Sequence, residues 1–281
     1  PTDQLGTILT RIGVPYISAE PATAELVKVA ANSFLATKIS FINAMAEVCD
    51  ATGADVTSLA DALGYDTRIG RRFLRAGLGF GGGCLPKDIR AFMARAEELG
   101  VGGAVSFLHQ IDEINTRQRR RTVDLARDMA GGEFGGRRIA VLGGTFKPDS
   151  DDVRDSPALA VAAAIHGEGA DVRLHDPKGM DNARAVLPVL DYVPDVTKAC
   201  EGADLVLHLT EWTDYRRIDP AELAAVTRAR RILDARNALD AALWTSAGWT
   251  LRVLGRPTPA PLPSQQTAAE HEWPLCPAEL G

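Results

Sequence analysis

One short segment, residues 79–88, combines residue types that could perform nucleophilic chemistry. It reads GFGGGCLPKD, and its three consecutive glycines allow the backbone to approach a ligand closely or to adopt positive φ. Pro86 and Asp88 are typical of a helix start. Cys84 would therefore lie at a helix N-terminus with Lys87 beside it, where a thiolate is favoured and can act as a nucleophile. A small structural cysteine before a helix fits the same residue types, so both interpretations stay open at this point.

The other three cysteines carry no such signal. Cys49 lies in a long apolar stretch, Cys200 near an expected helix end, and Cys276 in the C-terminal tail. No two of the four form a C-x-x-C pair, and no histidine stands at metal-ligand spacing from them, so no metal site is expected. A chain of 281 residues with 46% hydrophobic residues also needs no disulfide framework. We expect a reduced, cytoplasmic protein.

Two polar residues interrupt a long apolar helix pattern. Lys28 and Asn32 stand four positions apart, and therefore on one face of a helix expected over residues 23–51. A lysine that neutralises a developing oxyanion, with an asparagine that orients it or a water, would be the functional form of this pair. A stripe of surface polar residues has the same spacing, and the pattern alone does not separate the two.

Two segments that contain basic residues could bind a ligand. Residues 66–72 contain three arginines just before the glycine-rich loop, and arginine clusters suit phosphate or carboxylate groups. A second segment, from Lys147 to Arg154, follows an expected strand and so lies at the strand's carboxyl end, where open parallel sheets bind ligands. Solvated charged loops would have the same composition.

Composition limits the class of protein. The net charge of −6 argues against a general nucleic-acid binder. The longest apolar run, residues 158–165, is far too short to span a membrane. The chain begins with proline and shows no charged n-region or apolar h-region, so we expect no signal peptide and a chain that is a piece of something longer. No nucleic-acid or membrane partner is expected.

Periodicity divides the chain into a helical half and an α/β half. Helix patterns cover residues 23–51, 55–63, 88–99 and 105–130. Thr23 would be the N-cap of the first helix and Gly53 its stop. Beyond a glycine-rich boundary, a helix pattern at 156–166 stands among strand patterns at 137–142, 172–175, 203–209, 231–234 and 250–254. The fold class is therefore α/β overall: an all-helical domain followed by a doubly wound parallel α/β (Rossmann-like) domain.

Seven motifs occur together in one order and spacing across residues 5–256. They are the stretches 24–36, 51–56, 68–70, 79–88, 146–154, 210–212 and 234–237. On these motifs the chain resembles the nucleotide-sugar dehydrogenase family, the UDP-glucose/GDP-mannose dehydrogenases. The resemblance covers only the central and C-terminal domains of that family. Its N-terminal NAD domain, with a G-x-G-x-x-G fingerprint, has no counterpart in this chain.

The resemblance implies an NAD-dependent, four-electron oxidation of UDP-glucose to UDP-glucuronate. Cys84 matches the nucleophile that forms a thiohemiacetal and then a thioester with the sugar. Lys28 and Asn32 match the residues that stabilise the oxyanion and hold the water. Asp88 matches the acidic residue that assists with water or proton transfer.

The resemblance also implies residues that contact the ligands. Phe80, Gly81 and Gly82 match the loop along the sugar nucleotide. Arg68 matches an arginine that reaches the sugar from the neighbouring subunit, and Lys147 a lysine on the substrate side, where Lys87 adds another basic group. Arg154 matches a residue near NAD, the one cofactor expected.

The domain organisation follows from the same resemblance. We expect a linker remnant of a missing NAD domain at 1–22, a helical dimerisation and catalytic domain at 23–131, a UDP-binding domain at 137–255 and a proline-rich tail at 256–281. The expected partners are a UDP-sugar and a second copy of the chain, bound through the helix from Thr23. This chain alone would not turn over. The alternatives are another substrate, GDP-mannose or a UDP-N-acetylhexosamine, or a non-catalytic UDP-sugar-binding dimer module.

Overall fold

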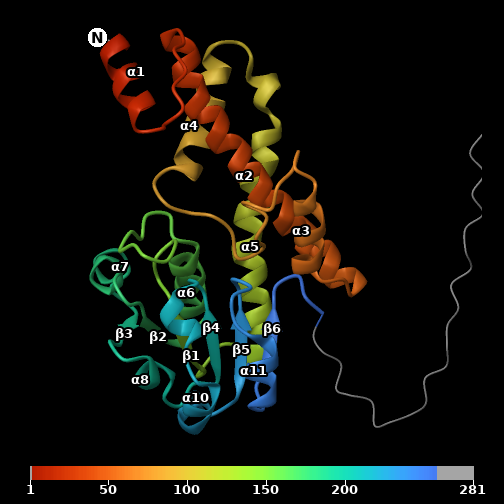
Figure 1. Ribbon diagram of the computed structural model, residues 1–281. Coiled ribbons are helices and arrows are strands. Elements are labelled where there is room, and N and C mark those ends of the chain that lie inside the picture. The colour runs from red at the N-terminus through yellow and green to blue at the C-terminus, as the bar shows by residue number, and fades with distance from the viewer. Residues whose placement is uncertain (1, 258–281) are drawn as a thin grey trace, which may run out of the picture.

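The computed structural model describes residues 2–257 as a helical half joined to a sheet with helices on both faces (Figure 1). The tail expected at 256–281 lies outside the described residues from residue 258 onward. The helical half contains α1 (Thr2–Arg11), α2 (Pro21–Thr52), α3 (Val56–Tyr65), α4 (Leu85–Glu98), the 3₁₀ turn η1 (Gly102–Val105) and α5 (Phe107–Ala130). None of the described helices is long and apolar enough to cross a membrane.

The first two helices differ from the sequence expectations in two places. The helix α1 lies within residues 1–22, where only a linker was expected. The N-cap of α2 is Glu20 rather than Thr23, because Pro21 is suited to a first helical position, where its missing N–H is not needed. Gly53 ends α2 as expected, in the left-handed conformation with φ of 76°.

The helix α4 begins three residues earlier than the sequence pattern predicts. It starts at Leu85 rather than Asp88, with Cys84 at the N-cap and the proline in the first turn. The Asp88 N–H donates to the Cys84 carbonyl over 2.8 Å, closing the first helical turn. Cys84 therefore stands at the helix N-terminus itself.

The predicted parallel, doubly wound sheet is confirmed. Its strands are β1 (Arg138–Leu142), β2 (Asp171–His175), β3 (Asp191–Tyr192), β4 (Leu205–His208), β5 (Arg231–Asp234) and β6 (Thr250–Val253). They pair in the order β3-β2-β1-β4-β5-β6, all parallel, and the order reverses between β1 and β4. Ligands of such sheets bind outside the carboxyl ends of the strands, at this reversal.

Both faces of the sheet are covered, so its strands are apolar on both sides. Along β1, Ile139 and Val141 pack into one core cluster while Ala140 and Leu142 pack into another, following the two-residue period of a strand. The covering helices are α6 (Pro157–Gly167), α7 (Met180–Val186), α8 (Val196–Cys200), α9 (Thr213–Arg216), α10 (Pro220–Val226) and α11 (Ala241–Ser246).

The helix α5 joins the two halves. Its C-terminal part contributes Val123, Ala126 and Ala130 to the first core cluster of the sheet, while its N-terminal part packs on α2 (Figure 1). Backbone hydrogen bonds also cross between the halves: Leu78 N–H donates to Ala235 C=O, and Val56 N–H donates to Gly255 C=O, both over 2.9 Å. The carboxyl ends of the strands therefore face the glycine-rich loop of the helical half.

Candidate active site

Three of the four residues expected to be catalytic form one hydrogen-bonded cluster. The Asp88 carboxylate, on the first turn of α4, accepts from Lys28 Nζ over 2.8 Å and from Asn32 Nδ2 over 2.7 Å. Both donors stand on α2, which packs on α4. Asp88 is 5% exposed, and Cys84 precedes it by four positions at the exposed helix N-terminus. The arrangement places an accessible thiol one helical turn from a buried carboxylate that is paired with an accessible lysine.

The charges in this cluster support one another. The hydrogen bond that Lys28 donates to Asp88, and the charge of that carboxylate, raise the pKa of the Lys28 ammonium, and the Cys84 sulfur adds to the same effect. The hydrogen bond from Lys28 lowers the pKa of Asp88. The pKa of Arg154 is raised chiefly by its hydrogen bond to Asp152, with a smaller contribution from Cys84. Lys28 and Arg154 are therefore the two cations on which the Cys84 sulfur acts.

The glycine-rich loop lies against the segment that follows β1. Gly82 N–H donates to the Arg154 carbonyl over 2.9 Å, and Gly82 has φ of 84°. A Cβ on Gly82 would lie 2.7 Å from the Phe146 ring, and one on Gly83 would lie 2.7 Å from the Arg154 guanidinium. A Cβ on Gly81 would overlap the Asp155 carbonyl oxygen. Only glycine allows the two segments to approach so closely.

Two side chains of α5 hold the same loop from the other side. The buried Asn115 accepts from Phe80 N over 2.7 Å and donates to Phe80 O over 3.0 Å. Arg119 donates to the same carbonyl over 3.3 Å and pairs with Asp155 over 2.9 Å. Asn115 was not among the residues expected from sequence, and its face of α5 also carries the buried polar residues Gln118 and Thr122, so no pattern marks it.

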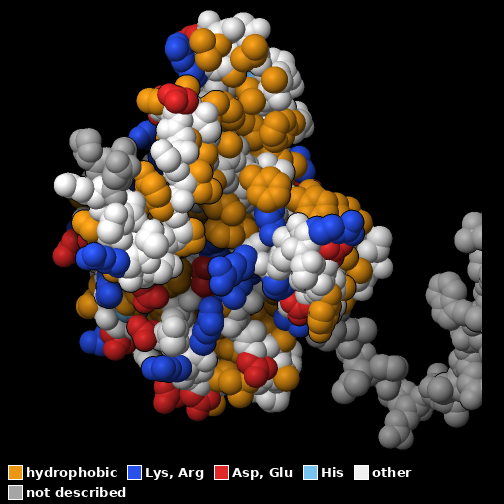
Figure 2. Space-filling view, turned by 45° about the horizontal axis from the view of Figure 1, so that its top comes forward, with side chains coloured by type: hydrophobic (Ala, Val, Ile, Leu, Met, Phe, Trp, Pro, Cys, Tyr) orange, Lys and Arg blue, Asp and Glu red, His pale blue; other side chains and the backbone are white. Residues whose placement is uncertain are grey.

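A cavity of about 690 Å³ opens between the two halves. Leu85, the neighbour of Cys84, lines it, as do Phe80 and Gly81 of the loop. The basic side chains in its wall are Arg71, Arg72, Arg75, Lys147 and Arg236. Of the described residues that line it, Glu211 alone is acidic. In Figure 2 basic side chains gather around a hollow near the middle of the view.

Several residues expected to bind ligand lie outside this cavity wall. Arg68 is exposed and pairs with Asp66, with Nη2 2.6 Å from Oδ2. Lys87 is exposed on the first turn of α4. Gly82 lies against Phe146, and Arg154 is paired with Asp152 over 2.6 Å. Within one chain the cavity therefore gathers Phe80, Gly81 and Lys147 of the expected set, together with arginines that were given no individual role.

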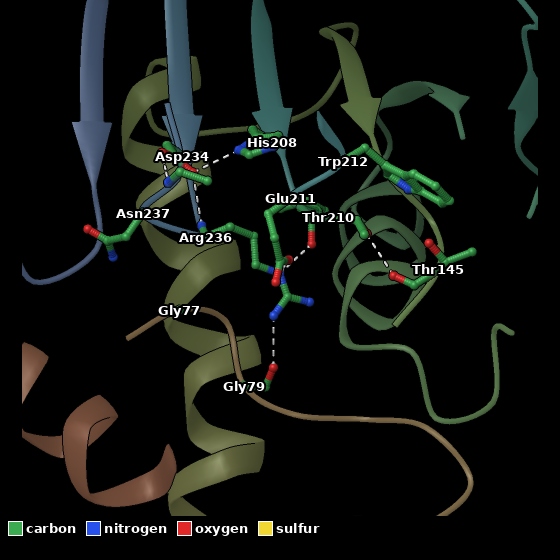
Figure 3. Close-up of polar contacts among 12 residues, drawn as sticks. Gly77, Gly79, Thr145, His208, Thr210, Glu211, Trp212, Asp234, Arg236 and Asn237 are labelled. Carbon is green, nitrogen blue, oxygen red and sulfur yellow. Dashed lines mark hydrogen bonds and ion pairs between the residues drawn. The ribbon is translucent and has the colours of Figure 1, made fainter. Parts of the chain in front are cut away.

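The most buried of these cations is Arg236, on the loop after β5. It is 9% exposed, and its Nε donates to Leu209 O over 2.7 Å. Nη1 donates to Gly79 O over 3.1 Å, and Nε lies 3.4 Å from Glu211 Oε2. Figure 3 shows the side chain reaching from the sheet toward Gly79, with Glu211 beside it. Arg236 therefore places a guanidinium at the boundary between the sheet and the glycine-rich loop.

The described residues do not fit a dinucleotide at the usual position of a Rossmann fold. In dinucleotide folds an acidic residue hydrogen-bonds the ribose, after a glycine-rich turn that receives the pyrophosphate. Here Asp176, after β2, is fully buried, and its carboxylate already accepts hydrogen bonds from groups of the chain itself. The donors are Gly144 N, Thr145 N, Thr145 Oγ1, Lys178 N, Gly179 N and Trp212 Nε1. Nor do residues 2–257 contain a cluster of side chains suited to a metal ion.

Two domain models of one protein family match this chain. The model of the UDP-glucose/GDP-mannose dehydrogenase central domain matches residues 22–117, and that of the family's UDP binding domain matches residues 140–241. The chain belongs to the UDP-glucose/GDP-mannose dehydrogenase family.

Individual relatives agree with this assignment. The UDP-glucose 6-dehydrogenase TuaD of Bacillus subtilis is 39% identical over 244 residues, which is 86% of this chain and 52% of the relative. Among solved structures, a UDP-glucose dehydrogenase from Pyrobaculum islandicum is 37% identical with a TM-score of 0.76, covering 84% of this chain and 53% of that one. A UDP-D-ManNAc dehydrogenase from Pyrococcus horikoshii is 26% identical with a TM-score of 0.74, covering 91% and 57%. This chain thus spans about half the length of the relatives it matches.

Proposed function

We propose that this chain carries the nucleophile and the sugar-nucleotide cavity of a UDP-glucose 6-dehydrogenase. The observation that carries the proposal is the Lys28–Asp88–Asn32 cluster at the start of the helix headed by Cys84, beside a cavity walled by five cations. A nucleophilic thiol needs cations nearby, and a sugar nucleotide needs cations for its pyrophosphate. The names of the relatives support UDP-glucose as the substrate.

In this proposal the cavity holds the nucleotide with the sugar directed toward Cys84. Arginine and lysine bind phosphate oxygens through charge-assisted hydrogen bonds, and the arginine fork can do so in a bidentate manner. Lys147, Arg75 and Arg236 stand in the cavity wall from both halves of the chain. Leu85 connects that wall to the nucleophile.

The second oxidation of the sugar uses Cys84 directly. The thiolate adds to carbon 6 of the aldehyde, and its oxygen takes up a proton to give a thiohemiacetal. Loss of a hydride from that carbon to the acceptor, and of the hydroxyl proton to solvent, gives a thioester. Water then displaces the sulfur and releases the acid and the free thiol. The proposed role of Lys28, whose ammonium pairs with Asp88 over 2.8 Å, is to stabilise the negative oxygen in the addition and hydrolysis steps.

The proposed hydride acceptor is NAD, and two NAD molecules would each accept one hydride for every sugar oxidised. The carboxylate of Asp176, where a dinucleotide ribose would bind in a Rossmann fold, is already hydrogen-bonded by groups of the chain itself. Arg154, whose side chain is 73% exposed beside Gly83, is the described residue proposed to face the cofactor.

Two further proposals concern the partner and the alternatives. The helix α2 presents Val27, Phe34, Phe41 and Val48, four exposed apolar residues spaced by seven, which suits pairing with a second copy of the chain. Another UDP-sugar is the second candidate substrate, favoured by the likeness to the UDP-D-ManNAc dehydrogenase. A non-catalytic UDP-sugar-binding dimer is the remaining alternative. A cytoplasmic location also stays a prediction.

Isothermal titration of the purified chain with UDP-glucose, UDP-N-acetylglucosamine and GDP-mannose tests the proposal. We expect UDP-glucose to bind most tightly and GDP-mannose most weakly. Undetectable binding of every UDP ligand would contradict the cavity assignment. A parallel assay of absorbance at 340 nm with NAD and UDP-glucose is expected to show no turnover by this chain alone, and steady NADH production would overturn that expectation.

A further inference from the structure

The loop after β5 is built around one buried carboxylate. Asp234, the last residue of β5, is fully buried and accepts four hydrogen bonds. Its Oδ1 accepts from His208 Nδ1 over 2.8 Å and from Arg236 N over 2.9 Å. Its Oδ2 accepts from Ala238 N over 2.8 Å and from Leu239 N over 2.9 Å. Both oxygens are therefore occupied, and the loop backbone cannot move without breaking bonds to a buried charge.

This loop makes three hydrogen bonds to the segment that leads into the glycine-rich loop. Leu78 N–H donates to the carbonyl of Ala235, and Arg236 Nη1 donates to the carbonyl of Gly79. Asn237 Nδ2 donates to the carbonyl of Ala76 over 3.2 Å. Asn237 holds a left-handed backbone with φ of 53°, an uncommon conformation that the bonds to the carboxylate maintain. The loop therefore contributes Arg236 to the cavity wall and also holds the segment of the helical half that lines the cavity beside it.

Nearby charges also act on Arg236 and Asp234. Burial lowers the pKa of the Arg236 guanidinium, opposed by the nearby charges of Glu211 and Asp234. Burial alone would raise the pKa of Asp234, but the nearby His208 and the hydrogen bonds it receives hold that pKa below its ordinary value. The carboxylate is thus ionised behind the arginine. Arg236 Nη2 has no hydrogen-bond partner among the described residues, although the side chain lines the cavity.

We propose that Asp234, held in turn by His208, is the positioning residue of the anion-binding cavity. It is fully buried and acts through Arg236, because it accepts a hydrogen bond from the backbone N–H of that residue and so fixes the backbone from which the guanidinium extends (Figure 3). The proposal rests on the proposed function, because it takes the phosphates of a UDP-sugar as the anion that Arg236 meets.

A double-mutant cycle with UDP as the probe separates positioning from general support of the fold. Asp234→Asn keeps the shape and removes the charge, and we expect it to weaken UDP binding about tenfold, the effect of losing one well-placed charged contact. Arg236→Gln is expected to weaken binding at least as much. The double variant should bind UDP within about twofold of Arg236→Gln, because Asp234 acts through that arginine. An equal tenfold loss in both backgrounds would overturn the proposal.

Two controls keep stability apart from binding. Asp204→Asn removes a buried carboxylate at the opposite end of the same sheet, where it accepts from Arg138 N over 2.9 Å. It should lower the melting temperature and leave UDP affinity unchanged. His208→Asn retains a donor in place of Nδ1 and is expected to bind UDP within about threefold of wild type, whereas His208→Leu should lose about tenfold. The histidine pair carries the test even where Asp234→Asn fails to fold.

The outcomes separate the two proposals. If the wild-type chain does not bind UDP, the proposed function fails. If the wild type binds and Asp234→Asn or His208→Leu binds within twofold of it, the positioning role fails while the proposed function stands.

Discussion

Lys28 Nζ on α2 and Asp88 Oδ2 on α4 lie 2.8 Å apart although sixty positions separate them in the chain. The lysine side chain is 67% exposed and the carboxylate only 6%, so the pair joins a buried anion to an accessible cation. The pair connects the two helices at the turn that begins with Cys84. An accessible ammonium held at a fixed place is what a developing oxyanion requires.

The stability contributed by this pair should depend on pH. The pKa of Asp88 is lowered in the folded chain by the hydrogen bond from Lys28. A lowered carboxyl pKa stabilises the fold above the unfolded value of about 3.9, and this contribution is lost as the pH falls through the lower folded value. Asp88→Asn should therefore be less stable than wild type at pH 7, and the difference should be smaller at pH 3. Urea unfolding at both pH values measures this difference in the free energy of unfolding.

The matched control for this measurement is Asp181→Asn. The Asp181 side chain is 97% exposed and pairs only with the nearby Arg184, so its removal should leave stability nearly unchanged at both pH values. A difference between Asp88→Asn and wild type that persists undiminished at pH 3 would contradict the ion-pair explanation.

Cys84 should be the first of the described cysteines to react with iodoacetamide. Its thiol is exposed, while Cys49 and Cys200 are buried. Burial raises the pKa of Cys49, and it raises the pKa of Cys200 to about 12, so little thiolate is present there at pH 7.5. Peptide mapping by mass spectrometry should find Cys84 alkylated at least about tenfold faster than either. Equal rates at the three sites would refute the placement of Cys84 at an open helix end.

A methyl group on the glycine-rich loop should disturb the contact between the two halves. A Cβ on Gly81 would overlap the Asp155 carbonyl oxygen, and backbone atoms cannot move aside cheaply. Gly81→Ala is expected to destabilise the chain by about 1–3 kcal/mol and to weaken UDP binding. Gly103→Ala, where no atom lies within 4 Å of the added carbon, should change stability by less than about 0.5 kcal/mol. Denaturant unfolding and titration with UDP compare the two variants. Equal stability and equal UDP affinity of Gly81→Ala and Gly103→Ala would refute the close contact.

The parts of the fold that follow local rules were accessible from sequence. The two-residue and helical periods identified the parallel sheet and the helical half, and the spacing of Lys28 and Asn32 indicated a shared helix face. The strand β3, Asp191–Tyr192, was missed because two residues carry no period. The start of α4 was misplaced because Pro86 is compatible with several positions in a first turn.

The contacts between distant residues were not accessible from the same rules. Nothing local predicts that Asp88 receives hydrogen bonds from α2, or that Asn115 holds the backbone of Phe80. Arg236 was part of a motif, but its place in the cavity depends on the order in which β4 and β5 pair. Contacts between residues far apart in sequence form only when the chain folds. Sequence patterns therefore identify the residue types, and their partners depend on the tertiary structure.

The exposed stripe on α2 predicts a dimer that two substitutions should dissociate. Phe34 is 65% exposed and Phe41 is 44% exposed, and with Val27 and Val48 they repeat every seven residues along one helix face. A charge on such a stripe cannot be buried against a second copy without a large desolvation cost. We expect light scattering at micromolar concentration to find a dimer for wild type and a monomer for the Phe34→Glu, Phe41→Glu double variant. Val186→Glu, which places the same charge on an exposed apolar residue of α7, should stay dimeric. A monomeric wild type, or a double variant that remains dimeric, would show that this face does not pair.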